Sequence, residues 1–548
     1  MKTLLLKGGT VVDNEQGTQK LADVLVENAR IVLIWKDIAP PDSSTQVIDC
    51  RGLVVVAGYV DAHVHVESSM VLPDAFGEAI LPHGTTTIIA DPHEVVNVAG
   101  ANGLQDFLCE AERAPISVFT VVPSSVPATP FDTNGAGEFL ASDMLPFVHR
   151  ADVVGLGEVM CAPDVVEKSP SIMDKISLFK HKTIDGHLPT SDAHLLDAYV
   201  EAGIQNDHET YDEASVLAHY ERGFNIYIRE GSAARNGETL LNLVKKHKLD
   251  IGQFAFCTDD KHLATIAEEG HISYLVAMAR RLGFDWCEVS RMASLNPCRF
   301  YRLAQRGNIR EGYVADIVIT DEMGEDVCHV IKHGEWVATN RKLRKQSAVC
   351  RSHQFENSLD YRNLTAADFV LHEHNRQVAI ELVDHQLLTL KATLAEGEWE
   401  TLPLLATIER HGKNGNIALC PIKNYGIRGG AVATSVSHDS HNVICVGDSP
   451  SDMAVACNRL REIGGGYVVI KDGRVIGELP LPAYGLMATT DAETTARQIH
   501  QVEVEAYKMG VNPNIDAFTT LSFVALPVIP SLRLLDTGLY DVEEGRFL

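Results

Sequence analysis

The sequence has no CxxC pair among its eleven cysteines, which are scattered from Cys50 to Cys457. An odd number of cysteines without a spacing pattern indicates free thiols in a reducing compartment rather than a disulfide framework. The sequence also has no apolar run of the about 20 residues that a membrane-spanning helix needs, and no recognisable signal peptide. We therefore expect a cytoplasmic protein with no membrane partner.

Positive charge is scarce as well. Lysine and arginine number 47 against 74 aspartates and glutamates, so the net charge is −27 at pH 7. Such a surface repels the phosphates of nucleic acids, which argues against a nucleic-acid partner and leaves a small neutral or cationic substrate compatible. The composition is otherwise that of a globular protein, and 548 residues suffice for two or three domains.

Two separated segments rich in short strands flank the middle of the chain. Residues 1–57 contain strand-like runs divided by turns such as Gly8-Gly9, and strand-like runs return within residues 302–345. We predict that both flanks together build one small β-sandwich domain.

The block between them, residues 58–301, alternates apolar strand candidates with helix-length stretches. The strand candidates include Thr86–Ala90, Ser117–Val122, Val153–Leu156, Thr183–Asp185, Phe224–Ile228 and Phe254–Cys257. This alternation predicts parallel βα units and a (β/α)₈ TIM-like barrel, in which catalytic residues gather at the C-terminal ends of the strands. Residues 346–365 are predicted to form a polar linker, and residues 366–548 an additional α+β domain.

His63 and His65 lie two residues apart at the end of an apolar run. Side chains two apart on a strand point to the same side, so both imidazoles can reach one metal ion. The HxH pattern is common by chance, and it specifies a metal site only together with further ligands.

Further ligand types follow four later strand candidates: Glu158, His187, His208 and Asp259. The carboxyl ends of barrel strands meet at one mouth, so all these side chains can converge. Four imidazoles and two carboxylates can hold two divalent ions with one carboxylate as a bridge, and such a pair lowers the pKa of a water between them. The mixed nitrogen and oxygen ligands suit Mn²⁺, Fe²⁺ or Zn²⁺.

Several motifs resemble those of bacterial adenine deaminases, a branch of the amidohydrolase superfamily. They are DAHVHVESSM, ADPHEVVN, GLGEVM, DGHLP, NDHE, IREGSAARN and CTDDK within residues 58–301, and SVSHDSHNV, GGG and LPVIP beyond them. HxH is shared by the whole superfamily, whereas the ESS, REGSAARN and HDSHN strings are far more specific. The resemblance extends from Gly8-Gly9 to the 520s.

The resemblance implies a metal-dependent hydrolase barrel that converts adenine and water to hypoxanthine and ammonia. It implies His63, His65, His187, His208 and Asp259 as ligands, with Glu158 in the bridging place, and a cofactor of two divalent ions. We expect Mn²⁺, with Fe²⁺ or Zn²⁺ as alternatives, and a homodimer.

The other expected roles follow from this resemblance. Asp259 is the expected proton shuttle, because ammonia leaves only when protonated. Glu67 would share the face of His65 if the strand continued, and Glu67 and Glu94 are both candidate acids. The candidate substrate contacts are Arg229, Ser232 and Arg235 of the barrel and His438, Asp439 and His441 of the last domain.

Four alternative functions are compatible with parts of the sequence. A zinc deaminase of the HxE and PCxxC type is excluded, because Pro297-Cys298 lacks the second cysteine, and a zinc protease is excluded because no HExxH occurs. A cyclic-amide hydrolase such as a hydantoinase or dihydroorotase shares the barrel and HxH, but would normally carry lysine where Glu158 stands. A degenerate relative acting as a binding protein would be expected to have lost ligands, and none of the six is missing.

Overall fold

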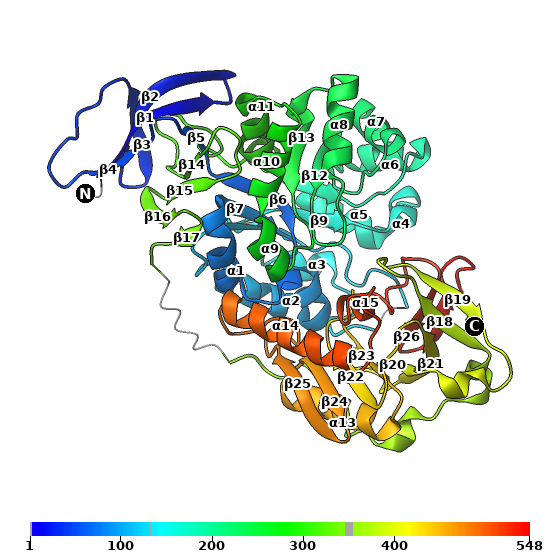
Figure 1. Ribbon diagram of the computed structural model, residues 1–548. Coiled ribbons are helices and arrows are strands. Elements are labelled where there is room, and N and C mark those ends of the chain that lie inside the picture. Colours follow the sequence, from blue (N-terminus) through cyan, green and yellow to red (C-terminus); the bar gives the residue numbers. More distant parts are fainter. Residues whose placement is uncertain (1–2, 132, 346–353) are drawn as a thin grey trace.

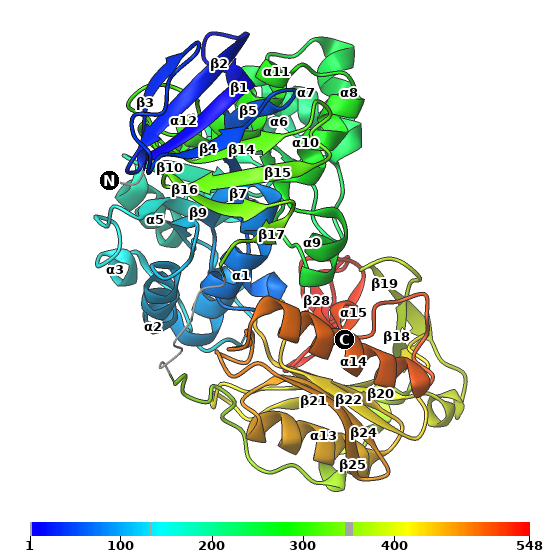
Figure 2. The ribbon, with the colours of Figure 1, turned by 60° about the vertical axis from the view of Figure 1, so that its left-hand side comes forward.

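A computed structural model describes residues 3–131, 133–345 and 354–548 (Figure 1). A sheet made from both flanks of the middle block lies at one end, a barrel occupies the centre, and a C-terminal domain lies against the barrel at the other end (Figures 1 and 2). None of the helices within these ranges is long and apolar enough to cross a bilayer.

The centre is a parallel barrel of eight strands, which hydrogen-bond in the order β13-β12-β11-β10-β9-β8-β7-β6. Their bounds are β6 (Tyr59–Val64), β7 (Thr85–Ala90), β8 (Ser117–Val122), β9 (Val153–Val159), β10 (Thr183–Gly186), β11 (Asn206–Asp207), β12 (Asn225–Arg229) and β13 (Phe254–Cys257). The first and last strands join where the Asp259 amide donates to the His63 carbonyl at 3.0 Å and the His65 amide donates to the Asp259 carbonyl at 3.2 Å. The predicted (β/α)₈ barrel is confirmed.

Helices cover the outside of the barrel. They are α1 (Pro73–Ile80), α2 (His93–Ala111), α3 (Ala141–Met144), α4 (Ala162–Val166), α5 (Pro170–Phe179), α6 (Ala193–Ala202), α7 (Glu213–Glu221), α8 (Gly237–His247), α9 (Leu263–Glu269), α10 (Ile272–Arg281), α11 (Trp286–Ser290) and α12 (Asn296–Phe300). Because the strands are covered on one side by helices and on the other by the barrel interior, they read as continuous apolar runs, such as the fully buried TTTIIA of β7.

The two flanks hydrogen-bond into one nine-stranded sheet. The first flank supplies β1 (Thr3–Asp13), β2 (Thr18–Glu27), β3 (Arg30–Trp35), β4 (Gln46–Asp49) and β5 (Val54–Ala57), and the second supplies β14 (Ile317–Thr320), β15 (Val327–Lys332), β16 (Glu335–Thr339) and β17 (Lys342–Leu343). The flanks meet where β5 pairs antiparallel with β14, so the barrel is inserted between two strands that are neighbours in this sheet.

The C-terminal domain has a mixed eight-stranded sheet in the order β19-β18-β21-β20-β23-β22-β24-β25. Its strands are β18 (Val378–Leu382), β19 (Thr389–Thr393), β20 (Leu404–Ile408), β21 (Ile417–Lys423), β22 (Gly430–Thr434), β23 (Val443–Gly447), β24 (Gly466–Lys471) and β25 (Arg474–Pro480). Helix α14 (Ala492–Lys508) contacts α1 and α9 of the barrel, whereas α13 (Pro450–Glu462) packs on the sheet away from it (Figure 2). The short helix α15 (Thr519–Ser522) and a small sheet of β26 (Leu532–Leu535), β27 (Gly538–Asp541) and β28 (Arg546–Phe547) complete the domain.

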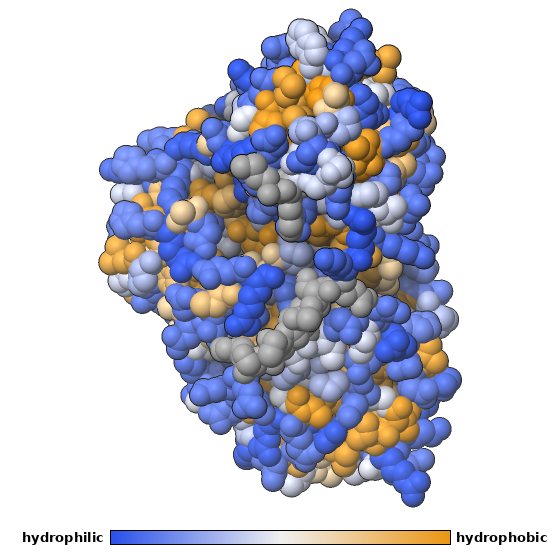
Figure 3. Space-filling view, turned by 90° about the vertical axis from the view of Figure 1, so that its left-hand side faces the viewer, coloured by the Kyte–Doolittle hydropathy of each residue, from blue (hydrophilic) through white to orange (hydrophobic). Residues whose placement is uncertain are grey.

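The surface of the molecule is largely polar on the face that Figure 3 shows. Its apolar residues lie there in small separate groups.

The cysteines in the part of the chain that the structure describes are all free thiols, as their spacing predicts.

A buried charged cluster ties the flank sheet to the barrel. The Asp316 carboxylate, directly before β14, accepts hydrogen bonds from Lys332 and Arg306, both at 2.8 Å, while its backbone carbonyl accepts from Gly58 at the start of the barrel. Asp316 is 9% and Lys332 is 5% exposed, whereas Arg306 is half-buried, so the carboxylate chiefly offsets the buried Lys332 ammonium.

We predict that Asp316→Ala lowers the free energy of unfolding by about 3–5 kcal/mol, because it leaves the buried Lys332 ammonium without its counter-ion. Asp49→Ala is the matched control, since Asp49 pairs with Arg51 in the same sheet but on the exposed surface, where such pairs contribute little. Urea unfolding of both variants measures the difference, and equal losses of stability would contradict the prediction.

Candidate metal centre and substrate cavity

The HxH pair lies at the end of the first barrel strand. β6 ends at Val64, yet the rings of His63 and His65 still point to one place, with their Nε2 atoms 3.1 Å apart. The Nδ1 atom of His65 lies 2.8 Å from the backbone carbonyl oxygen of Asp91. A carbonyl only accepts, so Nδ1 carries the proton and Nε2 is left to face the centre, as in histidines that bind metals.

Asp259 reaches this pair from the other end of the barrel sequence. Its Oδ1 lies 3.1 Å from His65 Nε2 and 3.8 Å from His63 Nε2, while its Oδ2 accepts a hydrogen bond from Arg229 Nη1 at 2.7 Å. Its backbone is left-handed, with φ of 59°, a conformation that aspartate tolerates better than most residues. The barrel closure and this turn therefore place Asp259 beside the HxH pair.

Glu158 lies between two groups of imidazoles. Its Oε2 lies 2.7 Å from His187 Nδ1 and 3.2 Å from His208 Nε2, whereas its Oε1 lies 3.6 Å from His65 Nε2 and 3.3 Å from His93 Nδ1. Each carboxylate oxygen thus faces its own set of ligand atoms. This is the arrangement that a carboxylate needs if it bridges two cations.

Carboxylates and imidazoles shift one another's pKa in the centre. Burial lowers the pKa of His187, but the carboxylates of Glu209 and Glu158 outweigh burial and raise that pKa to about 10. Burial raises the pKa of Glu158, yet the surrounding imidazoles, His187 foremost, hold it well below its usual value. Glu158 is therefore ionised near neutral pH, the form in which a carboxylate binds a divalent cation.

Three residues of the centre were missed by sequence reasoning. His93 is the first residue of α2 and contacts Glu158 through Nδ1 and Glu94 Oε1 through Nε2 at 3.4 Å. Glu209 lies 3.5 Å from His208, and Asp91 accepts a hydrogen bond from the Glu158 amide at 3.0 Å. A signal was present for His93, because ADPHE follows β7 as directly as the other ligands follow their strands.

A cavity of about 590 Å³ opens beside the metal ligands. The barrel lines one side of it with ligand residues, together with Arg229 and the small residues Gly231, Ala233 and Ala234. The C-terminal domain closes the other side with an apolar wall formed by Leu387, Phe523, Leu526, Val528 and Ile529. The site is therefore built from both domains, with the ligand residues on the barrel side and this apolar wall on the side of the C-terminal domain.

The HDSHN block belongs to this site. His438 and Asp439 line the cavity, and both His438 and His441 bond the carboxylate of Glu94. The Ser437 amide donates to Nδ1 of His441 at 3.1 Å, so the His441 proton is on Nε2, which donates to Glu94. Two histidines of the C-terminal domain thus fix one carboxylate of the barrel.

Other predicted residues lie elsewhere. The strand of the HxH pair does not continue to Glu67, because residues Val66–Ser69 form a 3₁₀ turn. Glu67 accepts a hydrogen bond from the Val95 amide at 3.2 Å. It borders a small cavity of about 40 Å³ that adjoins the large one, and it does not line the large cavity itself. Ser232 bonds Thr265 and the His262 amide. Arg235 is paired with Glu269 at the surface. Ser232 and Arg235 do not line the large cavity.

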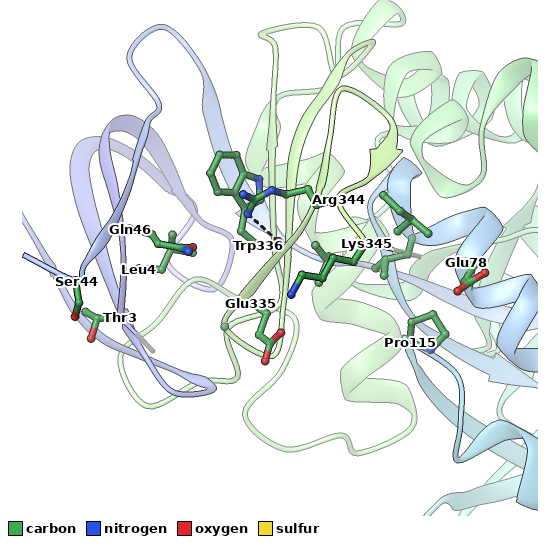
Figure 4. Close-up of a pocket in the computed structure, with 14 residues that line it drawn as sticks. Thr3, Leu4, Ser44, Gln46, Glu78, Pro115, Glu335, Trp336, Arg344 and Lys345 are labelled. Carbon is green, nitrogen blue, oxygen red and sulfur yellow. Dashed lines mark hydrogen bonds between the residues drawn. The ribbon is translucent and has the colours of Figure 1, made fainter. Parts of the chain in front are cut away.

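A further cavity of about 530 Å³ lies between the flank sheet and the barrel (Figure 4). Arg344 lies over the ring of Trp336 there, 3.8 Å from its centroid, with Glu335 and Lys345 nearby. Its described lining contains no histidine, cysteine or aspartate, so this cavity offers few metal ligands.

Two family models match the chain: the amidohydrolase family over residues 54–343 and the adenine deaminase C-terminal domain over residues 384–546. Adenine deaminase of Lysinibacillus sphaericus (strain C3-41) is 38% identical over 556 residues, covering 98% of this chain and 94% of that protein. Adenine deaminase of Desulfitobacterium hafniense (strain Y51) is 36% identical over 551 residues, covering 96% of each. The chain belongs to the adenine deaminase family.

Membership in the adenine deaminase family confirms the resemblance seen in the ESS, REGSAARN and HDSHN strings. The amidohydrolase match implies a divalent metal, and the centre around Glu158 has ligands for one. A solved β-aspartyl dipeptidase from Fervidobacterium islandicum AW-1 is 16% identical, with a TM-score of 0.49 over 63% of this chain and 100% of that chain. The cyclic-amide hydrolase alternative has no counterpart among the full-length relatives named above.

We predict that His63→Ala combined with His65→Ala abolishes tight divalent-metal binding, because it removes both imidazoles that the first barrel strand supplies to the centre. His194→Ala is the control, since His194 is exposed on α6. Elemental analysis after desalting measures bound metal per chain, and unchanged metal content in the double variant would contradict the assignment of the centre.

Proposed function

We propose that this chain is an adenine deaminase that hydrolyses adenine to hypoxanthine and ammonia at a centre of two divalent metal ions. The observation that carries the proposal is Glu158, whose two oxygens face separate sets of imidazoles beside a cavity that both domains close. The full-length relatives named adenine deaminase supply the substrate.

The ligands fit such a centre. His63, His65 and Asp259 bring donor atoms within 4.8 Å of one another, and so do His63, Glu158 and His208. Mixed imidazole and carboxylate ligands suit Mn²⁺, Fe²⁺ and Zn²⁺, of which we propose Mn²⁺. When bound, the cations would supply Lewis acidity that lowers the pKa of water to near neutrality.

Asp259 is the proposed proton carrier. Its Oδ1 faces the centre, where it can take one proton of the attacking water as the new bond from oxygen to C6 of adenine forms. The same proton then passes to the amino nitrogen, so that the carbon–nitrogen bond breaks with release of ammonia. The second water proton ends on the purine ring, which gives hypoxanthine. Arg229 holds Oδ2 and keeps Oδ1 turned toward the centre.

Glu94 is the better of the two candidate acids for the purine ring. Glu94 lines the large cavity and is held by His438 and His441, whereas Glu67 lines only the small adjoining cavity. We propose that Glu94 and His438 orient a ring nitrogen of the purine.

A homodimer in the cytoplasm is part of the same proposal, and gel filtration at known concentration tests the dimer.

We predict that the protein loaded with Mn²⁺ converts adenine to hypoxanthine and leaves hydantoin and dihydroorotate unchanged. The change in ultraviolet absorbance measures the conversion. The apolar wall and the carboxylates suit a flat neutral base. The absence of adenine turnover with each of Mn²⁺, Fe²⁺ and Zn²⁺ would contradict the substrate.

Asp259→Asn should lower kcat by about 100-fold to 10,000-fold, the usual contribution of a positioned acid–base group. Asp197→Asn is the matched control, because Asp197 pairs with Arg222 on the exposed surface of the barrel. Steady-state rates at saturating adenine give the comparison, with metal content measured alongside. Near-normal kcat in Asp259→Asn would remove Asp259 from the proton pathway.

A further inference from the structure

One buried arginine of the C-terminal domain holds the segments that form the apolar wall. Arg533 in β26 is 0% exposed. Its guanidinium donates to four backbone carbonyl oxygens: Nε to Ile529 at 2.6 Å, Nη1 to Phe523 at 2.9 Å, and Nη2 to Pro530 at 2.7 Å and to Leu387 at 3.2 Å. A guanidinium has five N–H donors in one plane, so these bonds use nearly all of its capacity.

Three of the four acceptor residues line the cavity. Leu387, Phe523 and Ile529 all line the cavity, and Leu387 is far in sequence from the other two. The guanidinium therefore joins two separate segments, residues 386–388 and 522–530, into one wall. Helix α15, which leads into the second segment, lies at the boundary between the barrel and the C-terminal sheet (Figures 1 and 2).

Packing alone does not explain a charged residue at this position. Arg533 has no ion pair with a carboxylate among the described residues, and burial lowers the pKa of its guanidinium to about 9. A buried cation without a counter-ion is costly, and an apolar side chain would fill the same space at less cost. What the apolar side chain lacks is the planar set of donors that fixes several carbonyl groups at once.

The wall also supports the groups that face the substrate. The ring of Phe523 stacks on the ring of His438, with centroids 4.6 Å apart and planes 23° apart. The His438 amide donates to the Ser522 carbonyl at 2.8 Å, and the His438 ring bonds Glu94. A shift of residues 522–523 would therefore move His438 and loosen Glu94.

We propose that Arg533 is a positioning residue for substrate binding, which sets the distance between the apolar wall and the metal centre. The identity of the substrate rests on the proposed function, whereas the wall and its attachment do not. Because the wall contacts substrate before and during the reaction alike, its loss weakens binding more than it slows chemistry.

Arg533→Lys and Arg533→Met test this role with adenine as substrate. Lysine keeps the charge but has a compact ammonium group that cannot reach both segments in one plane. We expect KM to rise about tenfold or more, with a smaller change in kcat and unchanged metal content. Arg533→Lys carries the test if Arg533→Met does not fold.

The matched controls are Arg410→Lys and Arg410→Met. Arg410 is also fully buried in the C-terminal domain, and its guanidinium donates to the Tyr484 carbonyl at 3.1 Å, outside the wall. We expect KM to stay within about twofold in both variants, because Arg410→Lys keeps the buried charge, Arg410→Met removes it, and both leave the wall attached. Equal KM changes in the Arg533 and Arg410 variants would overturn the proposal.

Amide hydrogen exchange provides a readout that needs no substrate. In the metal-loaded protein, Arg533→Lys should speed exchange in residues 386–388 and 522–530, and Arg410→Lys should leave both segments as in the native protein. This measurement needs no turnover of adenine. The proposed role of Arg533 can therefore be tested even if the proposed adenine deaminase activity is wrong. Unchanged exchange in both segments of Arg533→Lys would overturn the role of Arg533.

Discussion

The last strand of the barrel joins the first through the backbone of a single residue, Asp259, which bonds the backbones of His63 and His65. This junction closes the sheet, and it also sets three ligand side chains side by side. Fold and site therefore depend on the same few bonds. The remaining ligands need no such device, because the parallel strands β9, β10 and β11 already end at the same mouth.

Burying these charged ligand side chains together costs free energy, and this cost favours the binding of divalent cations. Carboxylates of Glu158, Glu209 and Asp259 are buried together with imidazoles, and burial by itself disfavours every charge among them. Their mutual contacts offset this cost in part, and divalent cations would offset it further. The C-terminal domain adds the opposite character, an apolar wall held by Arg533, so that a flat base would meet charge at its reacting edge and apolar surface elsewhere.

Local pattern predicted much of this. Apolar runs predicted the barrel strands, and the polar residues directly after these runs predicted the ligands. Both predictions were possible because a strand and the residue at its end are neighbours in the sequence. The resemblance gave the family through ESS, REGSAARN and HDSHN. Glu67 was misplaced because the chain turns at Val66, which the HxH spacing does not reveal. Arg235 lies in the same motif as Arg229 but faces surface carboxylates.

Contacts between distant segments were the part that sequence did not reveal. Nothing near Arg533 in the sequence indicates that it bonds Leu387, and nothing near Glu94 indicates the histidines of HDSHN. Such contacts depend on how the domains pack, which is a property of whole surfaces rather than of short motifs.

Anomalous X-ray diffraction from crystals of the Mn²⁺-loaded protein tests the central assignment most directly. The account predicts two metal peaks about 3.5–4 Å apart, the spacing of two-metal sites, with Glu158 in contact with both. A single peak, or two peaks that do not share Glu158, would contradict it.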